Sequence, residues 1–350
     1  MKKEGIRCIT IEAKDHYEFG FKVGSKLNEE IKSRLAKNKK AYSKRGVRDY
    51  SSLVKFSKKF LPAIQREVPF LLDYLHGLSK GSGAKFDDLL VLACEEEVLD
   101  FRVPGDALRT IPHCTNIGIR TQKGDILLGH NEDWIPEYRE NGFVIIKGTL
   151  GKKKFISLSY LGALPGNPCS VTSEGLAFTI NSLEIRRFRY GVPRSFQLSA
   201  LLSLNQEEQV ERALNFSKSS IGSNTLLAWE NSQIIDLEEL WESREKFENK
   251  NEVVHTNHPL LKKDQNKGNT EAESVNRYTR AVKLLQKHKK PTLSLLKKIL
   301  EDHEGRICKH YGMEDDSVTI NSTILSPNGR WIEVCAGNPC RAKYKRYYLK

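Results

Sequence analysis

The chain has 350 residues, of which 39% are hydrophobic and 29% charged, and its formal net charge is +13. This composition excludes collagen-like, coiled-coil and wholly disordered chains, and the length allows one or two domains. The longest unbroken apolar run, residues 89–94, is far shorter than the roughly 18 residues that cross a bilayer, so we expect no membrane span. Because no apolar segment follows the basic start at residues 1–3, we also expect no signal peptide and a cytoplasmic location.

The positive charge is spread along the chain and is not gathered in a tail. In the densest basic stretch, residues 22–59, the apolar residues Leu27, Ile31 and Leu35 stand at helical spacing among the lysines and arginines. This pattern favours a solvated helix face, and we therefore expect neither a nucleic acid nor a membrane as a partner. The seven cysteines, an odd number, are scattered, which favours reduced thiols over a disulfide framework.

In chain order, residues 14–103 are predicted to be mainly helical, because apolar residues recur there at intervals of three and four. From Pro112 onward, short β-like runs alternate with turn residues, which predicts antiparallel hairpins. The predicted strands are residues 116–122, 126–131, 143–147, 155–160, 176–181, 225–229, 233–237, 318–325 and 331–335. Helical patterning returns at residues 196–204, 206–216 and 271–303, while the polar runs 242–251 and 262–273 are predicted to be exposed loops. The chain therefore predicts antiparallel sheet layered with helices.

The most informative segment is the predicted hairpin around a two-residue turn at residues 123–124. With that turn, Cys114 lies opposite Asp133 and Asn116 opposite Asn131. Directly opposed side chains share a face, and alternate residues of a strand share it too. The hairpin thus predicts that these four side chains converge. The alternative is a solvated strand face with an incidental cysteine.

Cys114-Thr115, followed by the Asp133 of the segment 129–134 (GHNEDW), resembles the start of the mature chain in the penicillin acyltransferase-like family of N-terminal-nucleophile (Ntn) hydrolases. This family contains isopenicillin-N acyltransferase, corresponds to peptidase C45, and is more distantly related to choloylglycine hydrolases. The similarity runs along most of the chain, and the order and spacing of its motifs are more specific than any one of them. The other matching segments are Gly20 and Gly24, residues 81–84 and 87–90, 256–258, 307–310, 319–322 and 337–340.

The resemblance implies an α+β fold, the four-layer αββα sandwich with antiparallel sheets. It also implies that the precursor cuts itself between His113 and Cys114. Residues 1–113, mainly helical, and residues 114–350, which carry the nucleophile, would be the α and β subunits of one Ntn-type domain, a heterodimer of the chain's own fragments. The cut frees an α-amino group with a reference pKa of about 7.7–8.0 on the residue that carries the thiol, so nucleophile and base arrive together.

The resemblance also assigns roles to single residues. Asp133 matches the aspartate that binds and orients the new amino terminus, and Asn257 matches the asparagine whose side-chain amide helps to form the oxyanion hole. Asn181 resembles a second asparagine, which contributes its backbone N–H. His130 occupies the place where choloylglycine hydrolases carry arginine, and its role stays open. Supporting or substrate-binding positions are Thr115, Asn131 and His130.

The function implied is that of a self-processing cysteine amidohydrolase or acyltransferase, which acts on a small N-acyl amide or acyl thioester through an S-acyl-enzyme. Hydrolysis and transfer differ only in the acceptor, and the residues do not choose between them. One alternative is a non-catalytic Ntn-fold binding protein. Another is a papain-like hydrolase that pairs Cys114 with His255 or His258 and does not cleave itself.

A zinc site is a further alternative. Three thiols and an imidazole stand at Cys308, His310, Cys335 and Cys340. Their spacing fits no familiar zinc pattern, and a free cysteine is often a small buried hydrophobe. We therefore expect no metal and no cofactor.

Overall fold

The computed structural model describes residues 6–102, 114–139, 142–183, 189–203, 219–230, 232–240, 243–260, 271–288, 290–312 and 317–349. His113, the predicted helix at residues 206–216 and most of the predicted loop at residues 262–273 lie outside these ranges.

The amino-terminal part is helical, as predicted, apart from one strand at its start. Its helices are α1 (His16–Lys26), α2 (Asn28–Lys44), α3 (Tyr50–Lys58), α4 (Leu61–Glu67), α5 (Phe70–Ser82), α6 (Phe86–Ala93) and α7 (Glu95–Arg102). The helices described later in the chain are the short 3₁₀ helix η2 (Pro136–Tyr138), α8 (Arg194–Leu201), α10 (Glu271–Gln286) and α11 (Leu293–Leu300). α1 and α5 touch through glycines, because a Cβ added at Gly20 would stand 2.0 Å from the carbonyl oxygen of Tyr74.

The strands belong to two sheets. They are β1 (Arg7–Ala13), β2 (Thr115–Arg120), β3 (Ile126–Trp134), β4 (Phe143–Leu150), β5 (Lys153–Tyr160), β6 (Pro168–Thr172), β7 (Leu176–Ser182), β8 (Ser223–Trp229), β9 (Ile234–Glu239), β10 (Arg244–Asn249), β11 (Glu252–His255), β12 (Val318–Ser326), β13 (Trp331–Ala336) and β14 (Lys345–Tyr348). The eight-stranded sheet has the order β1-β4-β5-β6-β7-β8-β9-β10, and the six-stranded sheet has the order β11-β2-β3-β12-β13-β14. β1 pairs with β4 in parallel, whereas the other named pairs of strands are antiparallel.

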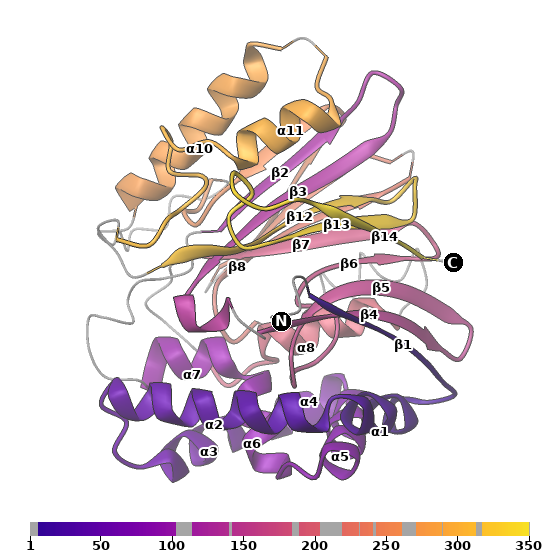
Figure 1. Cartoon of the computed structure of the whole chain (residues 1–350), viewed down its shortest axis with the longest axis vertical. Helices are drawn as coiled ribbons and strands as arrows, with labels where there is room; N and C mark the ends of the chain where they lie inside the picture. Colours follow the sequence, from indigo (N-terminus) through magenta and orange to yellow (C-terminus); the bar gives the residue numbers. More distant parts are fainter. Residues whose placement is uncertain are drawn as a thin grey trace.

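Figure 1 shows four layers: α10 and α11, the six-stranded sheet, the eight-stranded sheet, and the helices of the amino-terminal part with α8. A large apolar core joins the amino-terminal helices to both sheets, and a second core lies between the six-stranded sheet and the pair α10 and α11. The α+β class and the αββα sandwich are thereby confirmed.

One element prediction is wrong, and one helical region divides into two helices. Residues 244–249, predicted as a loop, form the edge strand β10. The prediction failed because an edge strand that carries many charged side chains has the same composition as an exposed loop. The helical patterning of residues 271–303 corresponds to two helices, α10 and α11, because Pro291 and Thr292, the N-cap of α11, separate them.

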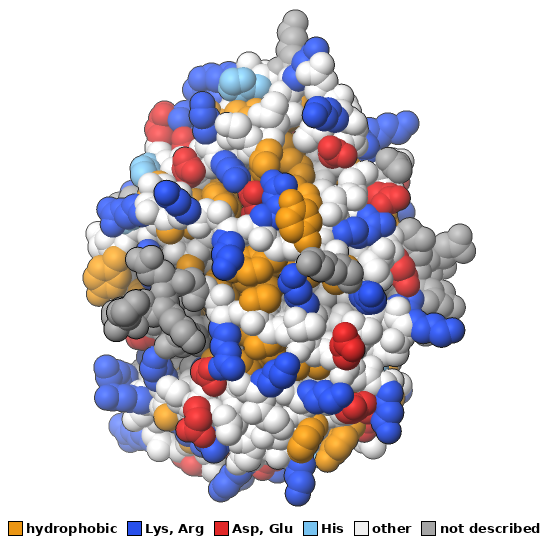
Figure 2. All heavy atoms as spheres, turned by 45° about the vertical axis from the view of Figure 1, so that its right-hand side comes forward, with side chains coloured by type: hydrophobic (Ala, Val, Ile, Leu, Met, Phe, Trp, Pro, Cys, Tyr) orange, Lys and Arg blue, Asp and Glu red, His pale blue; other side chains and the backbone are white. Residues whose placement is uncertain are grey.

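No helix among the described residues is both long enough and apolar enough to span a bilayer. On the face drawn in Figure 2, lysine and arginine side chains are dispersed and stand among acidic ones, in agreement with the charge distribution read from the sequence.

Candidate active site

The β2–β3 hairpin has a longer turn than the one predicted, and this changes its register. Arg120 pairs with Ile126, and the Thr121 and Gly124 amides donate hydrogen bonds to Asp125 O and Thr121 O at 2.8 and 2.9 Å. Gly124 takes the left-handed conformation, with φ of 89°. A three-residue loop that ends in such a residue is a common hairpin connection. The prediction of a two-residue turn is therefore wrong by one residue.

The new register replaces the partners of Cys114. Thr115 pairs with Asn131 and Asn116 with His130, so Glu132, not Asp133, is next to Cys114. A shift of one residue moves alternate side chains to the other face. Cys114 and Asn116 share a face with His130 and Glu132, whereas Asn131 and Asp133 point to the opposite face.

The thiol of Cys114 lies beside a buried acid and imidazole. Its Sγ is 3.8 Å from Glu132 Oε2, and His130 Nε2 is 2.6 Å from the same oxygen. Tyr160 donates its hydroxyl hydrogen to Glu132 Oε1. His130 Nδ1 lies 2.8 Å from Asn116 Oδ1, which can only accept, so Nδ1 carries a proton. His130 thus belongs to the thiol's surroundings, and the carboxylate of Glu132 is the nearest base.

A chain of buried amides continues behind His130. Asn116 Nδ2 donates to Asn224 Oδ1 at 3.1 Å, and Asn224 Nδ2 donates to Asp236 Oδ1. Asn224 Nδ2 also donates to the Leu237 carbonyl at 3.3 Å. Each donor meets an acceptor, which fixes the orientation of the Asn116 amide and therefore that of the imidazole.

The thiol is closed off from solvent in this uncut chain. Cys114 is 1% exposed, and burial, reinforced by Glu132 and Asp133, raises the pKa of its thiol well above the ordinary value. A cavity of about 20 Å³, room for about one water, adjoins Glu132, Tyr160 and Arg194. Arg194, whose Nη2 is 2.6 Å from Glu96 Oε1, is a nearby positive charge that favours the thiolate.

Asp133 lies on the opposite face of β3, directly across from Thr319 of β12. Thr319 Oγ1 donates to Asp133 Oδ1 at 2.6 Å, and among the described residues Oδ2 has no hydrogen-bond partner. Burial raises the pKa of Asp133 to about 8, although Lys309 and Arg277 oppose that rise. The carboxyl group thus keeps one oxygen available to a further donor.

Arg277 of α10 connects the strand of the nucleophile to Asn257. Its Nη1 donates to the carbonyl oxygen of Cys114 at 2.6 Å and to Thr115 Oγ1 at 3.0 Å, and its Nη2 donates to Asn257 Oδ1 at 2.7 Å. Thr115 therefore has a supporting contact. A guanidinium that spans these acceptors fixes both segments in one geometry.

The two asparagines of the expected oxyanion hole meet near the end of β11. Asn257 Nδ2 donates to the Ser182 carbonyl at 2.9 Å, and Asn181 Nδ2 donates to the carbonyls of His255 and Thr256 at 3.0 and 3.3 Å. The Asn181 side chain thus braces the segment that carries Asn257. The roles of both residues as oxyanion donors stay predictions.

Asn131 does not share a face with Cys114, contrary to the prediction. Its Nδ2 donates to the carbonyls of Leu300 and Ile307 at 2.9 and 2.8 Å, so it anchors the end of α11 and the loop that follows. His255 and His258, considered as partners of Cys114, contact Glu238 and Ser274 instead.

Sequence analysis missed four residues around the nucleophile: Glu132, Tyr160, Arg194 and Arg277. Only Glu132 had a local signal, because a three-residue loop ending at Gly124 puts it beside Cys114. The others come from distant segments. Donor type alone would also let Cys114, His130 and Glu132 hold a metal ion, since their ligand atoms lie within 4.8 Å of one another.

A family model described as acyl-coenzyme A:6-aminopenicillanic acid acyl-transferase matches residues 119–341. The beta-alanyl-dopamine/carcinine hydrolase of Drosophila melanogaster is 29% identical over 225 residues, 57% of this chain and 54% of that protein, so the chain spans about half the length of this relative.

Two solved structures are similar at low identity. They are a mutant of the conjugated bile acid hydrolase from Clostridium perfringens (TM-score 0.48, 14% identity, 68% of this chain and 97% of that one) and penicillin V acylase from Agrobacterium tumefaciens (TM-score 0.44, 11% identity, 64% and 83%). The family match covers more than half of the chain and includes Asp133, Asn181 and Asn257. The resemblance read from the sequence is confirmed, and this chain belongs to the acyl-coenzyme A:6-aminopenicillanic acid acyl-transferase family.

Proposed function

We propose that this chain is a self-processing cysteine hydrolase or acyltransferase that acts on C–N bonds of small N-acyl amides, or on acyl thioesters, in the cytoplasm. The observation that carries the proposal is the placement of the Cys114 thiol 3.8 Å from the buried Glu132 carboxylate, with a second carboxyl group, Asp133, on the other face of the same strand. Family membership supports it.

In the uncut chain, Glu132 takes the thiol proton while Cys114 Sγ attacks the carbonyl carbon of residue 113. The C–N bond breaks, its nitrogen takes the proton back from Glu132 and becomes the α-amino group of Cys114, and the acyl group passes to sulfur as a thioester. Water then hydrolyses the thioester and restores the thiol. Residues 1–113 and 114–350 stay together as one domain of two fragments, because apolar faces of the amino-terminal helices pack into the shared core.

After the cut, the new amino group is the base for turnover, and Asp133 Oδ2 accepts a hydrogen bond from it. The substrate carbonyl is attacked by Sγ, its oxygen is stabilised by Asn257 Nδ2 and the backbone N–H of Asn181, and the amine leaves with a proton. The S-acyl-enzyme is released to water or to a second amine.

Intact-protein mass spectrometry tests the cleavage step. Scaled by length from 39.9 kDa, the fragments have masses of about 13 and 27 kDa, and they should elute together on gel filtration. Cys114→Ala should remain one chain of full mass. Persistent full-length wild type that still hydrolyses amides would exclude the terminal-amine mechanism.

One observation also favours a second candidate, a non-catalytic binding protein: Cys114 is 1% exposed and burial raises its pKa. A stable, uncut wild type without turnover would select this candidate.

The acyl group is tested with a panel. The Drosophila relative is named for β-alanyl-dopamine and carcinine, so β-alanyl amides are the first candidates. We expect β-alanyl amides to turn over faster than propionyl amides of the same amines. Equal rates would show that the amino group of the β-alanyl moiety is not recognised, and an added amine that diverts product would identify acyl transfer.

A further inference from the structure

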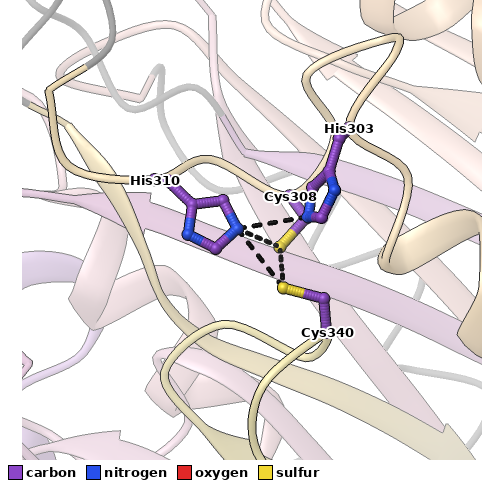
Figure 3. Close-up of side chains that lie close together, drawn as sticks. All are labelled: His303, Cys308, His310 and Cys340. Atoms are coloured by element: carbon purple, nitrogen blue, oxygen red, sulfur yellow. Dashed lines mark hydrogen bonds between the residues drawn. The ribbon is translucent and has the colours of Figure 1, made fainter.

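Four potential metal ligands meet at a place the proposed reaction does not use. His303 follows α11, Cys308 and His310 lie in the segment that leads to β12, and Cys340 lies in the turn between β13 and β14. Figure 3 shows the two imidazoles and the two sulfurs turned toward one another. The ligand atoms of all four lie within 4.8 Å of each other.

The distances are close to those of a tetrahedral zinc site. With zinc–sulfur bonds of about 2.3 Å and zinc–nitrogen bonds of about 2.0–2.1 Å, a regular tetrahedron places two sulfurs about 3.8 Å apart, two nitrogens about 3.3 Å apart, and sulfur and nitrogen about 3.6 Å apart. The Sγ atoms of Cys308 and Cys340 are 3.6 Å apart, and Nε2 of His303 and His310 are 3.1 Å apart. His310 Nε2 is 3.8 Å from Cys308 Sγ and 3.3 Å from Cys340 Sγ.

The geometry does not describe a disulfide, because bonded sulfurs stand about 2.05 Å apart. The surroundings of the sulfur suit a ligand instead. Asn338 Nδ2 lies 3.5 Å from Cys308 Sγ and donates toward it, and such contacts around a bound thiolate orient it toward the metal. Arg306, between His303 and Cys308, is held at a φ of 59°, a conformation that an arginine keeps only where surrounding contacts fix the loop.

We propose that His303, Cys308, His310 and Cys340 bind one structural zinc ion. Two thiolates and two imidazoles are a donor set that zinc prefers, and four protein ligands leave no open position for a catalytic water. This replaces the expectation of a metal-free chain. The ligands also differ from the four residues considered in the sequence analysis. His303 takes the place of Cys335, whose thiol donates to the Gly337 carbonyl.

The ion would link the loop after α11, the segment that leads to β12 and the β13–β14 turn, and this linked region supports Asp133. Lys309 lies between the ligands Cys308 and His310 in the sequence. Its Nζ is 2.8 Å from Glu273 Oε1, and its backbone N–H donates a hydrogen bond to Thr319 Oγ1 at 2.8 Å. Thr319 in turn donates to Asp133. The Asn338 side chain, from the Cys340 turn, donates to the Lys309 carbonyl. Zinc thus holds the scaffold on which Asp133 rests, and it takes no part in the reaction.

The test is the metal content of the full chain, measured by inductively coupled plasma mass spectrometry in the uncut Cys114→Ala background. That background removes one donor of the Cys114, His130 and Glu132 group and makes the result independent of cleavage. We expect about one zinc ion per chain after dialysis. In the Cys340→Ser and His303→Asn variants the zinc content per chain should fall at least 5-fold. The exposed controls Cys8→Ser and His288→Gln should keep it.

A second measurement covers variants that fail to fold. Cobalt(II) added to the apo chain should give the intense d–d absorption of a tetrahedral site with thiolate charge transfer, and zinc should abolish both. Removal of zinc should lower Tm by about 5 °C, reversed by zinc alone. A folded chain that binds neither metal, a Cys308–Cys340 disulfide in the mass spectrum, or undiminished zinc in both ligand variants would overturn the proposal. None of these results bears on self-cleavage.

Discussion

Replacing Asp133 by Asn should separate stability from chemistry. The pKa of Asp133 is about 8 in the folded, uncut chain and about 3.9 when unfolded, so folding takes up a proton at neutral pH. The folded state binds more protons than the unfolded one, and its stability therefore falls as the pH rises from about 4 to about 8. At pH 7 the gap of about three pH units, at 1.36 kcal/mol each, costs on the order of 4 kcal/mol.

Asparagine has no charge to lose and keeps an oxygen for the Thr319 hydroxyl. Asp133→Asn should therefore raise the Tm of the uncut Cys114→Ala chain, by about 5 °C at pH 7 and by less at pH 5. In the chain that retains Cys114, the same change should slow self-cleavage at least 10-fold, about 1.4 kcal/mol of transition-state stabilisation, because an amide cannot give up a proton to the forming amino group and pair with it as the Asp133 carboxyl group can.

The assays are thermal unfolding at several pH values and the time course of fragment appearance. Asp87→Asn is the matched control, since Asp87 forms an exposed pair with Lys58 at 2.8 Å and should change neither Tm nor cleavage by a large amount. An Asp133→Asn chain that is less stable at every pH, or a stability difference that does not grow with pH, would refute the reasoning.

Two further substitutions test the nucleophile and the oxyanion hole. Glu132→Gln keeps the size of the side chain and its contact with Tyr160 but removes the base 3.8 Å from Cys114 Sγ. The fragments should therefore appear about 10²-fold more slowly, and an unchanged cleavage rate would show that another group is the base. Asn257→Ala should lower kcat by about 10²–10³ with KM little changed, whereas a purely structural Asn257, held by Ser182 and Arg277, would lower Tm and leave kcat per folded molecule near wild type.

The sequence alone identified the hairpin, its cysteine, the α+β layering and the family. These conclusions depend on local patterns, such as the alternation of residues 114–134 and the order of short motifs. The register of the hairpin was missed by one residue, because the choice between a two- and a three-residue loop at Gly124 depends on which residue takes a positive φ. That one residue exchanged Asp133 for Glu132 beside Cys114.

The tertiary structure decided which distant residues complete the site. Arg277 reaches Cys114 from α10, Tyr160 reaches Glu132 from β5, and Thr319 reaches Asp133 from β12. The residues in each of these contacts are far apart in the sequence, so no periodicity or motif spacing indicates that they meet. The same reason hides the four-ligand cluster: His303 and Cys340 meet only because the loop after α11 and the β13–β14 turn lie side by side in the fold. A sequence supplies donor types, whereas their convergence depends on packing between segments far apart along it.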